Sequence, residues 1–160
     1  MNLILNVQPN KMNKNSYCVI MAGGLGKRFW PVSTKACPKQ FCDILNVGKS
    51  FLRQTFERAN QIFDTRNIFI VTGSAYEELT KQQIPEIPTE NILKEPFGKN
   101  TAPCVAYAAY RIARINPHAS MVVVPSDHFI TNDAVYLDNI QKGISFVEQF
   151  GGLLTIGINP

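Results

Sequence analysis

Short apolar runs recur along the chain, separated by polar turns and amphipathic stretches. Runs of this length, bounded by glycine, proline or asparagine, are typical of buried β-strands. The run at 121–124 is wholly apolar, which we expect of a central parallel strand covered on both faces. The pattern predicts strands at residues 17–22, 67–72, 91–95, 121–124 and 153–158.

Between these runs, apolar residues recur at the spacing of an amphipathic helix. In the stretch 50–63, for example, Leu52, Phe56 and Phe63 share one face while charged residues occupy the others. The segment 84–88 is expected to be a loop because its prolines break regular structure. The pattern predicts helices at 50–63, 74–82, 101–115 and 133–150. This alternation of strands and helices indicates an α/β fold with a doubly wound, mostly parallel, Rossmann-like sheet.

A cationic, glycine-rich segment follows the first predicted strand. Gly23, Gly24 and Gly26 precede Arg28, and basic residues outnumber acids from position 23 to position 53. Glycine lets the backbone approach a ligand closely, and exposed N–H groups in such a loop hold anions. The segment therefore suits a phosphate group, although a glycine pair after a strand is also a common turn.

Two familiar phosphate-binding motifs are excluded. A Walker A loop ends in Gly-Lys-Ser/Thr, whereas Gly26-Lys27 is followed here by Arg28. The dinucleotide fingerprint requires a third glycine where this chain has Phe29. The segment is thus a phosphate loop of another kind or a simple turn.

Three separated blocks of sequence carry a recognisable order of motifs: Gly23–Ser33 continued by Pro38–Phe41, then Glu95–Pro103, then Val124–His128. Together they resemble the signature of the sugar-nucleotide pyrophosphorylases, and the Trp-Pro and Pro-Lys-Gln-Phe elements are similar to the mannose-1-phosphate guanylyltransferases. The resemblance implies a fold of the nucleotide-diphospho-sugar transferase type. The blocks follow the first, third and fourth predicted strands, so a parallel sheet would bring them to one edge, where ligands bind.

The resemblance implies transfer of GMP from GTP to mannose 1-phosphate, giving GDP-mannose and pyrophosphate with Mg²⁺ as cofactor. Chemistry of this type requires mainly positioning and charge neutralisation. Under this resemblance Arg28 and Lys39 are the catalytic cations, and the carboxylate of Asp127 is the metal ligand.

The resemblance also implies a nucleotide-binding set. The backbone N–H groups of the glycines would hold the triphosphate, and the carboxylate of Glu95 would accept hydrogen bonds from guanine or remain a surface group. Asn100 and Thr101 either cap the following helix or present its N-terminus to an anion. The set is Gly23, Gly24, Gly26, Glu95, Asn100 and Thr101.

The composition narrows the possible partners. A chain of 160 residues, 45% of them hydrophobic, suits one globular domain. The net charge of +4 is concentrated near the glycine segment, which favours a small anionic ligand over nucleic acid, and no apolar run could span a membrane. The 4 cysteines lack paired spacing, which disfavours zinc and suits free thiols in the cytoplasm.

We expect residues 1–16 to form a flexible leader. We expect residues 17–160 to form the N-terminal, nucleotide-binding part of a domain that continues beyond the chain end, because the family's later sugar-binding segment and second metal-binding aspartate have no counterpart here. Such a part would bind GTP with Mg²⁺ but turn over slowly or not at all. The alternatives are a pyrophosphorylase of other base or sugar specificity, a non-catalytic nucleotide-binding regulatory module, and a generic dinucleotide-binding domain; assembly into a homo-oligomer stays open.

Overall fold

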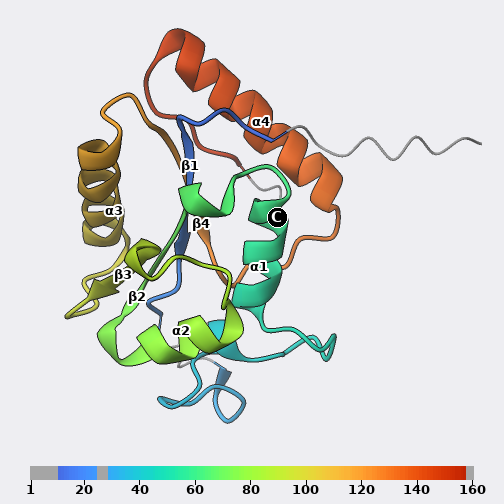
Figure 1. The fold of residues 1–160 in the computed structure, drawn as a ribbon. Coiled ribbons are helices and arrows are strands. Elements are labelled where there is room, and N and C mark those ends of the chain that lie inside the picture. The colour runs from blue at the N-terminus through green and yellow to red at the C-terminus, as the bar shows by residue number, and fades with distance from the viewer. Residues whose placement is uncertain (1–10, 25–28, 158–160) are drawn as a thin grey trace, which may run out of the picture.

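The computed structural model describes residues 11–24 and 29–157, which form a parallel sheet with helices on both faces (Figure 1). The strand order is β3-β2-β1-β4, and each neighbouring pair runs parallel. The strands are β1 (Ser16–Met21), β2 (Ile68–Gly73), β3 (Ile92–Glu95) and β4 (Ser120–Pro125). The main helices are α1 (Phe51–Asn60), α2 (Glu77–Gln83), α3 (Thr101–Ile115) and α4 (Asp133–Phe150). The predicted α/β class is therefore confirmed.

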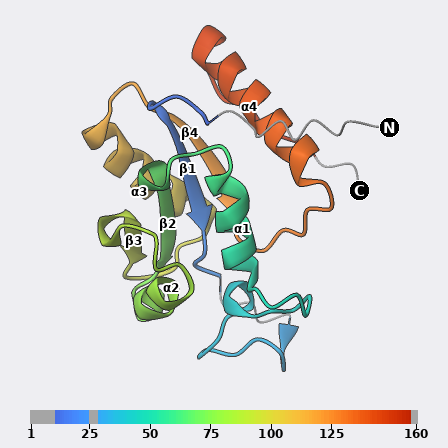
Figure 2. The same cartoon turned by 45° about the vertical axis from the view of Figure 1, so that its right-hand side comes forward.

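Strand β1 lies inside the sheet and is apolar from Tyr17 to Met21, because both of its faces are covered. Cys18 and Ile20 face one buried cluster, whereas Tyr17 and Val19 face the other. This division follows from the two-residue period of a strand. Helices α1 and α4 pack on the first face and α3 packs on the second (Figure 2). None of the helices in residues 11–24 and 29–157 combines the length and apolar character needed to cross a bilayer.

The predicted strand at 153–158 is wrong over its described residues. Residues 153–157 have no regular structure, and the side chain of Leu153 is fully exposed. Gly151 and Gly152 end α4 with φ of +73° and +94°, and the chain then passes close to Gly143 of the same helix through Leu154. An apolar run becomes a strand only when a neighbouring strand satisfies its backbone, and the residue pattern does not report that neighbour.

The expectation that 121–124 is a central strand is also wrong, although the strand packs against a buried cluster on each of its faces. Strand β4 is at the edge of the sheet that the described residues form. Its residues Met121, Val122 and Val123 are only half-buried, and Val124 alone among 121–124 is buried. An apolar run indicates that both faces of a strand are hydrophobic, but it does not indicate whether the strand has one neighbouring strand or two.

The predicted leader divides into two parts. Residues 1–10 lie outside the described residues. The backbone N–H of Met12 donates to the carbonyl of Ile62 at 2.6 Å, and the amide of Asn13 donates to the carboxylate of Glu148 at 3.0 Å. Strand β1 begins at Ser16, so the described fold begins before residue 17.

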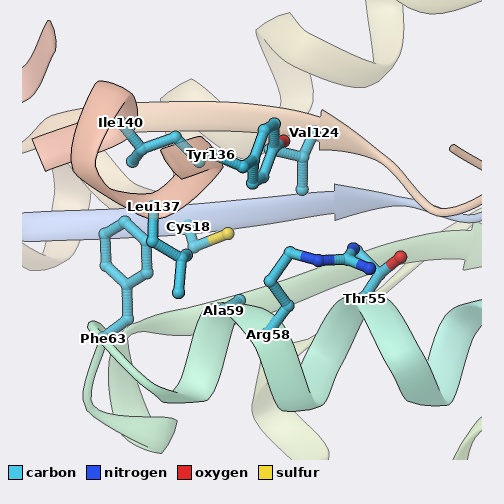
Figure 3. Close-up of a pocket in the computed structure, with 9 residues that line it drawn as sticks. All are labelled: Cys18, Thr55, Arg58, Ala59, Phe63, Val124, Tyr136, Leu137 and Ile140. Carbon is cyan, nitrogen blue, oxygen red and sulfur yellow. The ribbon is translucent and has the colours of Figure 1, made fainter. Parts of the chain in front are cut away.

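A cavity of about 10 Å³ lies between α1, α4 and the sheet (Figure 3). This volume is that of about one water molecule, so the cavity is no site for a nucleotide. Its polar wall is Arg58, which is buried, donates to the carboxylate of Asp133 at 2.6 Å and lies 5.9 Å from the centroid of the Tyr136 ring. The ion pair thereby joins α1 to the first turn of α4.

Replacing Asp133 with alanine is expected to lower the free energy of unfolding by about 1–2 kcal/mol, because it leaves the buried Arg58 guanidinium unpaired. Urea denaturation measures the effect. The matched control is Asp138→Ala on the same helix, which breaks an exposed pair with Lys142 and should change stability by less than about 0.5 kcal/mol. Equal losses in the two variants would show that Arg58 does not depend on its partner.

Candidate functional site

The described residues of the three blocks singled out in the sequence meet at the edge of the sheet where the strands end. The ladder continues past the strand ends, since the N–H of Ala22 donates to the carbonyl of Val71 at 2.7 Å and the N–H of Ser126 donates to the carbonyl of Met21 at 3.1 Å. These bonds fix the starting points of the glycine segment after β1 and of Asp127 after β4. Parallel strands therefore bring distant parts of the chain together, as predicted.

Lys39 and Asp127 form an ion pair across this edge. The Nζ of Lys39 lies 3.1 Å from the Oδ2 of Asp127, although the two residues are 88 positions apart. The Lys39 side chain is only 16% exposed, whereas that of Asp127 is 42% exposed and accessible to a ligand. A half-exposed carboxylate beside a sheltered ammonium can exchange partners when an anion or a metal ion arrives.

Two aromatic rings shelter the ammonium group of Lys39. It lies 4.2 Å from the centroid of the Phe29 ring and 5.4 Å from that of the Phe51 ring. The negative faces of such rings attract a cation and limit its contact with water. Neither Phe29 nor Phe51 is a predicted site residue. The signal in the sequence is the position of Phe29 in the same block as the Pro-Lys-Gln-Phe element and of Phe51 at the start of α1.

Lys39 begins a short 3-10 helix, η2 (Lys39–Phe41), whose orientation is fixed by buried contacts. The Phe41 ring is buried and lies 5.8 Å from the Tyr76 ring. The side-chain amide of Gln83 donates to the carbonyl of Phe41 at 2.9 Å. A lysine at the start of such a fixed turn has a defined direction toward Asp127.

Asp127 is placed in a similar way. The hydroxyl of Thr55 in α1 donates to the carbonyl of Ser126 at 3.3 Å, and both residues are buried. Ser126, the residue before Asp127, is therefore hydrogen-bonded both to α1 through Thr55 and to β1 through Met21. Thr55 is a further residue that sequence reasoning missed, because a lone threonine within an amphipathic helix gives no signal.

Glu95 lies directly beside the glycine segment. A Cβ on Gly23 would come within 2.9 Å of the Oε2 of Glu95, so a larger residue at position 23 would displace this carboxylate. Burial raises the pKa of Glu95 above its ordinary value. A partly desolvated carboxylate at this position can accept hydrogen bonds from a ligand, as its predicted role requires.

Asn100 and Thr101 are exposed at the start of α3. Asn100 occupies the N-cap position with φ of +68°, and its side chain makes no cap hydrogen bond. Capping by Asn100, one of the two readings left open by the sequence, is therefore not observed. The backbone N–H groups of the first turn are left for an anion or for water.

Gly24 is exposed, and apart from its chain neighbours none of the described residues lies within 4 Å of a Cβ added to it. Gly26 and Arg28 lie outside the described residues. The predicted approach of Arg28 to Asp127 across the phosphates therefore stays a prediction.

A magnesium site at this edge would rest on Asp127. Among residues 11–24 and 29–157, no three side chains of His, Cys, Asp or Glu form a metal-binding group. Mg²⁺ typically takes one or two carboxylates and completes its coordination with substrate phosphates and water. One accessible carboxylate fits that partial donor set, and it does not fit a metal that requires a complete protein cage.

Comparisons with known proteins identify similar chains. The mannose-1-phosphate guanylyltransferases of Escherichia coli and Klebsiella pneumoniae are each 34% identical to this chain over 144 residues. The match covers 89% of this chain and 30% of each relative, so the chain spans less than a third of their length.

Two solved structures share the fold. The mannose-1-phosphate geranyltransferase of Thermus thermophilus superposes with a TM-score of 0.71 at 26% identity, over 84% of this chain and 39% of that one. The mannose-6-phosphate isomerase of Helicobacter pylori superposes with a TM-score of 0.61 at 23% identity, over 83% and 47% of the two chains. The second likeness concerns the fold alone.

The family model for nucleotidyl transferases matches residues 17–159, which include the glycine segment, Lys39, Glu95 and Asp127. The match runs from the second residue of β1 to beyond the end of α4. The chain therefore belongs to the nucleotidyl transferase family.

Proposed function

We propose that this chain is the nucleotide-binding part of a mannose-1-phosphate guanylyltransferase. In the complete enzyme GMP passes from GTP to mannose 1-phosphate, giving GDP-mannose and pyrophosphate. This chain binds GTP with Mg²⁺ and turns over slowly or not at all by itself. It spans 30% of the length of relatives such as that of Escherichia coli. The proposal places the protein in the cytoplasm, where its free thiols stay reduced.

The observation that carries the proposal is the Lys39–Asp127 pair beside the glycine segment. It brings one cation and one accessible carboxylate to the sheet edge where α/β proteins bind nucleotides. The family match supports the reaction class, and the similarity to guanylyltransferases supports guanine and mannose 1-phosphate over another base or sugar.

In the proposed reaction an oxygen of the sugar phosphate attacks the α-phosphorus of GTP. A new oxygen–phosphorus bond forms as the bond from the α-phosphorus to the bridging oxygen breaks, and that oxygen leaves with pyrophosphate. The attacking phosphate is already an anion, so no side chain has to remove a proton. This chain's residues contribute position and charge.

Each residue has a separate task. Backbone N–H groups of Gly23 and Gly24 hold triphosphate oxygens, and the Lys39 ammonium neutralises charge at the α-phosphate. Arg28, by its planar guanidinium, would bridge two phosphate oxygens. Asp127 would hold Mg²⁺, which when bound supplies further charge neutralisation at the phosphates.

A titration with GTP and with NADH, each with and without Mg²⁺, tests the proposal. Trp30 is the chain's 1 tryptophan, is 78% exposed and follows the glycine segment, so its fluorescence is a suitable signal. We expect GTP to bind and Mg²⁺ to tighten its binding. Binding of NADH in preference to GTP would instead indicate a dinucleotide-binding domain.

Replacing Glu95 with glutamine is expected to reduce the preference for GTP over ATP about tenfold, because the carboxylate is proposed to accept from both N1–H and N2–H₂ of guanine. The fold should be retained, because burial disfavours the charged form at this position and glutamine is neutral. Competition of GTP and ATP for the same site measures the preference. An unchanged preference in the variant refutes the role of Glu95.

A further inference from the structure

The backbone carbonyl of Ala22 receives two side-chain hydrogen bonds at the exit of β1. The side-chain amide of Gln40 donates to it at 2.7 Å, and the hydroxyl of Thr72 donates to it at 3.1 Å. Gln40 is 3% exposed, and Thr72 and Ala22 are buried as well. A carbonyl oxygen has two lone pairs, so these donors fill its hydrogen-bonding capacity.

The two donors come from different parts of the fold. Thr72 belongs to β2, the neighbour of β1 in the sheet, whereas Gln40 belongs to η2. The hydrogen bond from Gln40 therefore joins the turn that carries Lys39 directly to the residue that precedes the glycine segment. Lys39 and Gln40 are adjacent, yet one reaches Asp127 after β4 and the other reaches Ala22 after β1.

A packing role does not account for a glutamine at this position. A buried amide is costly unless it is hydrogen-bonded, so an apolar residue of similar size would fill the same space without that cost. Thr72 already supplies one donor to the Ala22 carbonyl. The second donor is therefore dispensable for satisfying the carbonyl, and its particular consequence is the fixed distance between two segments of the site.

That distance matters for a triphosphate. A phosphate chain that contacts both the Gly23 backbone and the Lys39 ammonium requires the two to stay in register, and a displacement of about 1 Å can cost about a hundredfold in function. Glu95 lies on the other side of Gly23, because its Oε2 would be 2.9 Å from a Cβ placed on that residue.

We propose that Gln40 is a positioning residue that sets the spacing between Gly23 and Lys39 by holding the carbonyl of Ala22. Thr72 shares this carbonyl and holds it in line with the sheet. The inference rests on the proposed binding of a nucleoside triphosphate at this edge, and it extends that proposal to a residue that touches no substrate.

The test compares Gln40→Met, which keeps the length of the side chain and removes the donor, with Gln82→Met on the exposed face of α2 as the matched control. The full chain is titrated with GTP–Mg²⁺ and with guanosine through Trp30 fluorescence. We expect Gln40→Met to weaken GTP about tenfold or more and to leave guanosine within about twofold, because only the phosphates span the two segments. Gln82→Met should match the parent chain for both ligands.

A second pair of variants keeps the test decisive if Gln40→Met folds poorly. Thr72→Val removes the other donor and should weaken GTP binding by a smaller factor than Gln40→Met does. Thr72→Ser retains the hydroxyl and should bind GTP as tightly as the parent chain. Equal weakening of GTP and guanosine together with a lowered melting temperature would reduce Gln40 to a structural residue, and unchanged GTP affinity in Gln40→Met would overturn the inference.

Amide hydrogen exchange in the free protein separates this inference from the proposed function. If Gln40 fixes the glycine segment, the amides of Gly23 and Gly24 exchange faster in Gln40→Met than in Gln82→Met. If exchange is faster in Gln40→Met but the parent chain does not bind GTP, the proposed ligand is refuted and the positioning role of Gln40 stands. If exchange at Gly23 and Gly24 is unchanged in Gln40→Met, the positioning role of Gln40 is refuted, whichever ligand binds.

Discussion

Replacing Lys39 with methionine is expected to weaken GTP binding about 10- to 100-fold, the effect of losing one charge-assisted hydrogen bond to a phosphate. Methionine keeps an apolar side chain of similar length between the rings of Phe29 and Phe51. The ion pair with the half-exposed Asp127 contributes at most about 1 kcal/mol to folding, so the variant should remain folded. Fluorescence titration of GTP in the presence of Mg²⁺ measures the loss.

The matched control is Lys49→Met. Lys49 is an exposed lysine ten positions further along that pairs with Glu57 instead of an acid of the site. Its replacement lowers the net charge of the chain by the same amount and should leave GTP affinity within about twofold, because exposed charges at a distance are screened by salt. If both variants lose affinity equally, GTP affinity depends on the overall charge of the chain, and a specific role of Lys39 in binding the phosphates is refuted.

Replacing Asp127 with asparagine is expected to abolish the dependence of GTP binding on Mg²⁺. We expect Mg²⁺ to tighten GTP binding at least about tenfold in the parent chain and less than about twofold in the variant, because the amide is a much weaker ligand for this ion. Without Mg²⁺ the variant should bind GTP as well as the parent or better. The substitution removes a negative charge near the phosphates and frees the Lys39 ammonium from its partner.

Asp138→Asn provides the control for Asp127→Asn, since Asp138 pairs with Lys142 on the surface of α4. Its response to Mg²⁺ should equal that of the parent chain. Retention of a full Mg²⁺ response by Asp127→Asn would exclude this carboxylate as the ligand and would leave the ion bound to the nucleotide alone.

The sequence predicts well those features that depend on one element at a time. The prediction of a helix at 133–150 is confirmed, because its apolar positions repeat at helical spacing and Gly151 and Gly152 end it. The structure adds the cap at Asn132, whose side chain accepts from the N–H of Val135. The meeting of the glycine segment, Glu95 and Asp127 at one edge follows from the parallel order of the strands alone. It required no knowledge of side-chain contacts.

Features that depend on several elements together were beyond the sequence. The run at 153–158 has the composition of a strand, but whether it pairs depends on the path that the chain takes after Gly151 and Gly152. The enclosure of Lys39 by two aromatic rings and the two hydrogen bonds to the carbonyl of Ala22 each depend on how separate elements pack against one another. No local periodicity encodes such contacts.

The position of bound nucleotide tests the central claim most directly. Mn²⁺ can replace Mg²⁺ beside GTP, and its unpaired electrons broaden the NMR signals of nearby amides. We expect the strongest broadening at Asp127, Lys39 and Gly23, where the strands end, and little at Ser16 and Ser120, where β1 and β4 begin. Broadening centred on those first residues, or spread evenly over the sheet, would contradict a phosphate site formed by Lys39, Asp127 and the glycine segment.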